Sequence, residues 1–138
     1  MPVWSHLPNA AHIDALLADV KARPKVWDAS WYVVRDTIYA DDGDAAENAS
    51  WRAVRSTIRG AERDALLDAA WRTILDTIHD TARGTAWRAI SALITWDESA
   101  ALLDLTPDAL RTIISTCDGA VKYQAVLLLP AVIVRSNT

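Results

Sequence analysis

Small and apolar positions recur along the middle of the chain in four similar segments. Each contains a small residue, a Trp, a Val or Ile three positions later and an Ile seven positions later. At about 100° per residue, these offsets fall within a narrow stripe on one side of a helix, whereas a strand would place them on both faces. The pattern therefore predicts four amphipathic helices. The segments are ASWYVVRDTI (29–38), ASWRAVRSTI (49–58), AAWRTILDTI (69–78) and TAWRAISALI (85–94).

The Trp residues of these segments are expected to anchor their helices in the core, because they share a register with Val and Ile. Clustered indoles can also stack on sugars, bases or quaternary ammonium groups, which is the alternative interpretation. The chain has seven Trp, three Tyr and no Phe, so Trp takes positions that Phe often fills. Trp4, Trp27 and Trp96 lie outside the register, and we expect them to be partly exposed.

Successive repeat Trp residues are 20, 20 and 16 positions apart, which leaves room for one helix and a short turn in each unit. Gly43, Gly60 and Gly84 fall between the units, where breaks are expected. Short connections make neighbouring helices antiparallel.

The segments that flank the repeats also predict helices. Asn9–Arg23 is amphipathic and should end at Pro24. Thr106 followed by Pro107 predicts a later helix start, because a capping side chain followed by Pro at the first helical position is a favoured arrangement. A short helix should precede it over 97–105, and Gly119 should follow it.

The last helix, from Ala120, is apolar enough to lie centrally or against a partner. Pro130 should bend or end it. The whole pattern predicts an all-α, single-domain protein over residues 1–138, either a compact bundle or a short stack of seven to eight antiparallel helices on a repeat of about 20 residues. Its parts would be a leading helix (9–23), four Trp-centred repeat helices (27–96) and C-terminal helices (97–138).

The A-[SA]-W-R-x-[VI] units resemble the Ala/Trp-rich helical arrays of uncharacterised proteins from phages and GC-rich bacteria, some of them grouped as immunity proteins. The resemblance covers roughly residues 27–96, and the first unit departs from it with Tyr32 in place of Arg. It implies a host-modulating or immunity-type protein, encoded by a phage or mobile element. It assigns no residue a role.

Composition narrows the range of functions. The net charge is −4, and acidic and basic residues alternate, which does not favour nucleic acid binding. A single cysteine, Cys117, excludes an intrachain disulfide and fits a reducing compartment. The longest apolar run, Ala125–Val134, is too short to span a membrane. We therefore expect a cytoplasmic protein, in the host cytoplasm if phage-encoded, without membrane insertion. The apolar C-terminal helix makes a homodimer plausible.

Familiar chemical motifs are absent from the sequence. The three histidines do not form a zinc pattern, and neither HExxH nor CxxC is present. The acids at 41–44 lack the ligand order of a calcium loop. Cys117 has no identifiable base, and there is no GxSxG, phosphate loop or dinucleotide fingerprint. We expect no enzymatic activity, no cofactor and no metal.

Arginines directly follow three of the repeat Trp residues, at Arg52, Arg72 and Arg88. Stacked helices could align them on one surface that grips carboxylates or phosphates of a partner. The alternative is that their stems cover Trp edges while their heads remain solvated.

Three classes of function follow. The first is a non-enzymatic helical-repeat module that binds a protein partner. The second is a small-molecule-binding or enzymatic bundle with a site assembled from several helices. The third is a nucleic-acid binder that reads with the Thr106–Thr116 helix, although that helix carries only Arg111.

Overall fold

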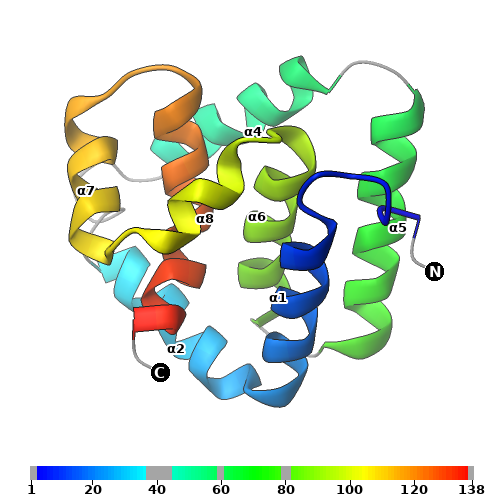
Figure 1. Cartoon of the computed structure of the whole chain (residues 1–138). Helices are drawn as coiled ribbons and strands as arrows, with labels where there is room; N and C mark the ends of the chain where they lie inside the picture. The colour runs from blue at the N-terminus through cyan, green and yellow to red at the C-terminus, as the bar shows by residue number, and fades with distance from the viewer. Residues whose placement is uncertain (1–2, 37–44, 59–60, 79–81, 137–138) are drawn as a thin grey trace.

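The structure, a computed structural model, describes residues 3–36, 45–58, 61–78 and 82–136. These ranges hold seven α-helices and one 3-10 helix and contain no strand, as the hydrophobic pattern predicts (Figure 1). The elements are α1 (Ala10–Ala22), α2 (Pro24–Val34), α4 (Ala45–Thr57), α5 (Ala61–Thr77), α6 (Ala82–Thr95), η2 (Ser99–Asp104), α7 (Pro107–Thr116) and α8 (Ala120–Ser136).

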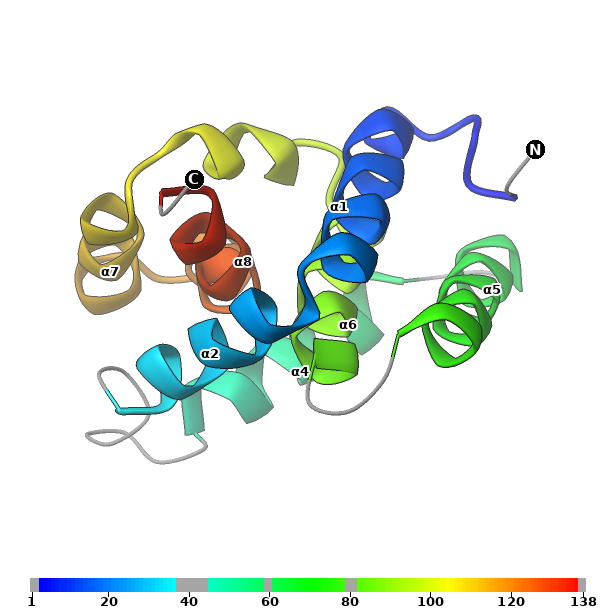
Figure 2. The ribbon, with the colours of Figure 1, turned by 90° about the horizontal axis from the view of Figure 1, so that it is seen from below.

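Two helices, α6 and α8, lie side by side at the centre of the bundle. Helix α8 packs against α2, α4, α6, α7 and η2, whereas α6 packs against α1, α2, α4, α5 and α8. Seen from below, the other helices surround this pair (Figure 2). A helix covered on several sides must be apolar around most of its circumference, which both central helices are.

The apolar run of α8 serves this chain's own core. Gln124 to Val134 are all buried, so the C-terminal helix takes the central place that was one of its two expected positions. Its burial removes the reason for expecting a homodimer through this helix. The helix also continues through Pro130 to Ser136 rather than ending there. Because Pro has no N–H, the carbonyl of Val126 lacks its usual helical donor.

The repeat helices do not stack in chain order. Helix α4 packs mainly on α8, and α5 packs mainly on α6. The Val or Ile three positions after each repeat Trp is buried as predicted, at Val34, Val54, Ile74 and Ile90. Of the Ile residues seven positions after each Trp, Ile78 and Ile94 are buried and Ile58 is partly buried, whereas Ile38 lies outside the described residues. The repeat in the sequence is therefore a repeat of amphipathic helices, and the bundle arranges them around α6 and α8.

Side chains from two distant segments hold the C-terminal end of α6. Asn9 Nδ2 donates to the carbonyls of Leu93 (2.9 Å) and Trp96 (3.2 Å), and Asn9 is itself buried. Arg63 donates to the carbonyl of Ile94. Terminal carbonyls have no partner within a helix, so these donors fix α6 against the rest of the bundle.

The helix boundaries follow the sequence signals at most of the described positions. Pro24 ends α1 and begins α2, and Thr106 Oγ1 accepts a hydrogen bond from the backbone N–H of Ala109 (3.1 Å). Gly119 has φ of +79°, a conformation that favours glycine, directly before α8. The prediction of a break at Gly84 was wrong, because Gly84 lies inside α6. The breaks expected at Gly43 and Gly60 lie outside the described residues.

Candidate functional site

The burial of the Trp residues is the reverse of the sequence prediction. Trp4, Trp27 and Trp96, expected to be partly exposed, are 4%, 2% and 6% exposed. The four repeat Trp residues, expected to be core anchors, are only partly buried and pack at the edge of the core. These four are Trp31 on α2, Trp51 on α4, Trp71 on α5 and Trp87 on α6.

The indoles of three repeat helices meet at Trp87. The Trp51 ring stacks on Trp87 with centroids 6.3 Å apart and an interplanar angle of 17°. The Trp71 ring meets Trp87 in an edge-on arrangement with centroids 5.2 Å apart. Both geometries are among those that aromatic pairs prefer. The sequence repeat thus brings equivalent residues of α4, α5 and α6 to one place.

The fourth indole joins this group through Arg88. The guanidinium of Arg88 lies 4.0 Å from the centroid of the Trp31 ring, and its Nε donates to Glu47 Oε1. Trp51 Nε1 also points at that carboxylate oxygen, at 3.4 Å. The side chains of Arg88 and Glu47 are 18% and 12% exposed, so most of this ion pair is removed from water. We call these four indoles, Arg88 and Glu47 the Trp cluster.

Gly84 leaves room for this arrangement. A Cβ at Gly84 would lie 3.0 Å from Arg88 Nη1, one helical turn further along α6. Arg88 is held on its other sides by Glu47 and Trp31, so it has little freedom to move aside. The glycine that seemed to mark a break is explained by the space that the Arg88 guanidinium occupies.

The structure separates the three arginines that the sequence singled out. The Arg88 guanidinium pairs with Glu47 and lies over the Trp31 ring. Arg72 is exposed (76% of its side chain) and pairs with Asp68 at 2.9 Å on the same helix. Arg52 is exposed beside Trp51 on α4. Arg88 is therefore not part of an exposed row, while Arg52 and Arg72 remain candidates for partner contact.

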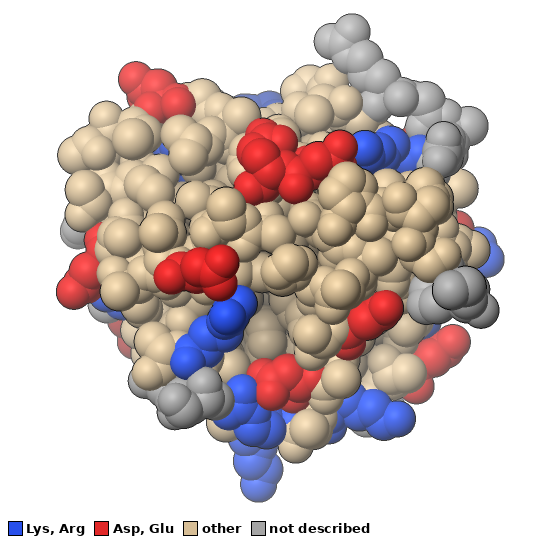
Figure 3. Space-filling model, in the orientation of Figure 1, with Lys and Arg blue, Asp and Glu red and all other residues tan. Residues whose placement is uncertain are grey.

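A second site lies where α1, α2, η2 and α8 meet. Its cavity volume is about 310 Å³, and Figure 3 shows a hollow in the surface between α1 and α8. Apolar side chains form most of the lining, and charged groups of α1 and α8 stand at its edge. We call it the Asp19 pocket; it is lined by His12, Ala15, Leu16, Asp19, Arg23, Trp27, Leu103, Ala131 and Arg135.

Asp19 organises one side of this pocket. Its carboxylate accepts hydrogen bonds from Arg23 Nε (2.9 Å), Arg23 Nη2 (2.8 Å) and Trp27 Nε1 (2.8 Å). The bonds from Arg23, more than the one from Trp27, hold the pKa of Asp19 below its ordinary value, against the opposing effect of burial. The same pairing raises the pKa of Arg23. The spacing of Asp19 and Arg23 four residues apart on a helix was a sequence signal for this pair that went unused.

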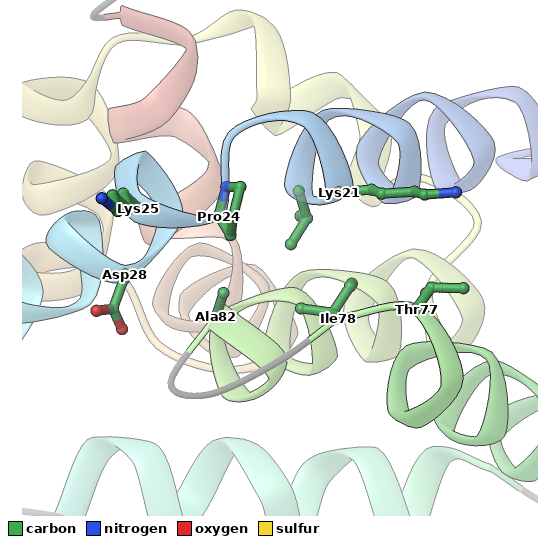
Figure 4. A pocket seen from close by; sticks show the side chains of 8 residues that line it. Lys21, Pro24, Lys25, Asp28, Thr77, Ile78 and Ala82 are labelled. Carbon is green, nitrogen blue, oxygen red and sulfur yellow. The ribbon is translucent and has the colours of Figure 1, made fainter.

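A further pocket of about 250 Å³ lies between the α1–α2 junction and the facing ends of α5 and α6. Figure 4 shows Lys21 and Lys25 extending away from each other rather than converging. The two lysines therefore do not form a common cationic site in this pocket.

Within the described ranges, no group of three or more His, Cys, Asp or Glu side chains could hold a metal ion. None of the described helices is both long and apolar enough to cross a membrane. Cys117 follows α7, and its Sγ lies 3.8 Å from Thr116 Oγ1.

Comparison with known proteins gives no relative from which a role could be transferred. No protein-family model, curated protein or solved structure matches the chain.

Proposed function

We propose that this chain is a non-enzymatic helical module that binds a protein partner, and that the Trp cluster with Arg52 and Arg72 is its contact surface. A host-modulating or immunity-type protein would act through such a surface, and this is the biological role that we propose for it.

The observation that carries the proposal is the partial exposure of four indoles from four helices. The centre of the bundle is filled by aliphatic residues of α6 and α8, which are almost completely buried. The three other Trp residues, Trp4, Trp27 and Trp96, are buried within that core. The repeat Trp residues therefore keep part of their apolar surface in water, although the fold buries Trp elsewhere.

Indoles placed in this way are suited to a protein interface. Trp, Tyr and Arg are enriched among the residues that contribute most to protein–protein affinity. Arg52 and Arg72 directly follow two indoles of the cluster and are exposed. The mostly buried pair of Arg88 and Glu47 holds the side chains of the cluster in place before a partner binds. This reduces the entropy that is lost when the surface is ordered on binding.

The charges on one face of the molecule and on α7 support a protein over a nucleic acid as partner. On the face shown in Figure 3, acidic and basic side chains are interspersed without a continuous basic patch. On α7, the helix considered as a reading element, Arg111 pairs with Asp108 at 3.0 Å. Neither feature resembles the basic face of a phosphate-binding protein.

The test compares proteins captured by the wild-type chain with those captured by the double variant Arg52→Ser/Arg72→Ser, from cells that express the chain. Arg88 is left intact because it stabilises the fold. We expect the variant to keep its thermal transition and to lose the partner. The matched control is Arg111→Ser, which removes another arginine that pairs with an acid of its own helix. Capture of the same partner by wild type and double variant would contradict the proposal.

A further inference from the structure

The exposed charges beside one indole of the Trp cluster, on α4, are basic. Arg55 lies one helical turn after Trp51 and therefore on the same side of α4, and Arg52 directly follows Trp51. Both arginines are exposed, whereas the one acidic residue in the sequence of α4, Glu47, pairs internally with Arg88. We call Arg52 and Arg55 the basic edge.

The exposed charges beside another indole of the cluster, on α5, are acidic. Asp64 and Asp68 precede Trp71 by seven and three positions, which places both residues on the same side of α5 as the indole. Both are exposed. Asp68 pairs with Arg72, but both side chains of that pair are mostly in water, so another cation can replace Arg72 at little cost. We call Asp64 and Asp68 the acidic edge.

Apolar surface joins the two edges. The Trp87 ring on α6 lies against the rings of both Trp51 and Trp71. All three indoles are partly exposed. Leu75, one helical turn after Trp71, is 38% exposed and extends this apolar surface along α5. The contact surface thus has a basic edge, an aromatic centre and an acidic edge.

A surface with this order of charges is complementary to a copy of itself. A two-fold rotation about an axis through the aromatic centre exchanges its two edges. The basic edge of each copy then faces the acidic edge of the other, and the two aromatic centres meet between them. Trp and Arg are also enriched among the residues that contribute most to interfaces. All the complementary charges belong to this chain, so they identify the second copy as an occupant without any assumption about a foreign protein.

We propose that a second copy of this chain covers the Trp cluster when no other protein is bound, in a weak dimer with two-fold symmetry. This inference rests on the proposed function, because it names a partner for the same contact surface. Exposed ion pairs contribute little, so we expect a dissociation constant on the order of 100 µM. At low micromolar concentration most molecules are then monomers, and the surface is open to another protein.

The test exchanges charges between the two edges and follows the mass of the purified full chain by sedimentation equilibrium. The wild type should rise from monomer toward dimer between about 10 µM and about 500 µM. The all-acidic variant Arg52→Glu/Arg55→Glu and the all-basic variant Asp64→Lys/Asp68→Lys should each remain monomeric, because like charges then face each other. Their equimolar mixture should associate at least about tenfold more tightly than either variant alone, because every edge again meets an opposite charge.

Two controls separate the exchange from misfolding and from net charge. Each variant should keep the wild-type thermal transition in circular dichroism, because the substituted side chains are exposed. Lys21→Glu/Lys25→Glu is the matched control, since it shifts the net charge as much as the all-acidic variant does, at exposed positions outside the Trp cluster. It should self-associate as the wild type does, because physiological salt screens exposed charges that lie more than about 8 Å apart.

Two results would overturn the inference. The first is a wild type that stays monomeric over the whole concentration range. The second is a mixture of the two variants that associates no more tightly than each variant alone. Neither result bears on the proposed function, which is tested by capture of a different protein from cells. Restored association in the mixture without such a capture would support the dimer and contradict the binding of a foreign partner.

Discussion

Removal of Arg88 should destabilise the fold far more than removal of the neighbouring repeat arginine Arg72. Arg88 pairs with Glu47 where both side chains are mostly buried, and it also lies on the Trp31 ring. Breaking a buried pair by removing one partner costs about 3–5 kcal/mol, since the other charge is left uncompensated. The residual exposure of 18% and 12% places Arg88→Ala near the lower end, at about 3 kcal/mol.

The exposed pair of Arg72 and Asp68 gives the internal comparison. Its side chains are 76% and 60% exposed, so Arg72→Ala should cost at most about 0.5 kcal/mol. Arg72 and Arg88 each directly follow a repeat Trp, so the two substitutions are made in similar sequence contexts.

The assay is urea unfolding followed by far-UV circular dichroism. With an m-value of about 1.5 kcal/mol/M, Arg88→Ala should lower the midpoint by roughly 2 M, and Arg72→Ala should barely move it. A double-mutant cycle of Arg88→Ala with Glu47→Ala should show a coupling of about 2 kcal/mol. Equal, small losses for Arg88→Ala and Arg72→Ala would refute the internal position of Arg88.

Three further predictions concern other positions. Gly84→Ala should destabilise the wild type by about 1 kcal/mol through the clash with Arg88. In the Arg88→Ala background the same change should stabilise the protein by a similar amount, because Ala favours the helix more than Gly does. Urea midpoints of the wild type, the two single variants and the double variant measure this change of sign. Asn9→Asp should cost about 2 kcal/mol in thermal unfolding, because Asp cannot donate to the carbonyls at the end of α6, whereas a simple N-capping role would make the change neutral. Asp19 has a pKa below its ordinary value in the folded state, so its stabilising contribution is present above about pH 4 and is lost as the pH falls through the folded pKa. Urea midpoints measured against pH should therefore fall less steeply at acid pH in Asp19→Asn than in the wild type.

Helix positions could be read from the sequence because their signals are local. Pro24, Thr106 and the Val and Ile positions of the repeats act through backbone geometry and periodicity within one helix. The structure confirms the helices that they predict. The central place of α8 was foreseen as one of two options, because periodicity cannot distinguish burial within the chain from burial against a partner.

The burial of the Trp residues could not be read from the same pattern. In each repeat the Trp lies at one edge of the apolar stripe, about 60° from the Val or Ile three positions later. The core centres on those aliphatic residues, at Val34, Val54, Ile74 and Ile90, which leaves each indole on the flank. Residues of one stripe therefore lie on the same side of the helix, but the stripe does not tell which of their side chains are most deeply buried.

The candidate sites depend on contacts between distant segments, which explains why the sequence did not reveal them. Glu47 and Arg88 lie 41 positions apart, and no local motif joins them. The Asp19 pocket needs Arg135 from the end of the chain. Only the pair of Asp19 and Arg23 has a local signal, which is the spacing of four residues on a helix. Nothing in the sequence indicates that this pair lines a cavity.

The solvent exposure of the seven indoles decides whether the repeat Trp residues form a contact surface. The chain would carry 5-fluorotryptophan, each ¹⁹F signal would be assigned by a Trp→Phe variant, and a soluble gadolinium chelate would be added. We expect strong relaxation of the signals of Trp31, Trp51, Trp71 and Trp87, and weak relaxation of the other three. Equal protection of all seven signals would contradict this expectation, because the repeat indoles would then be core residues and not a contact surface.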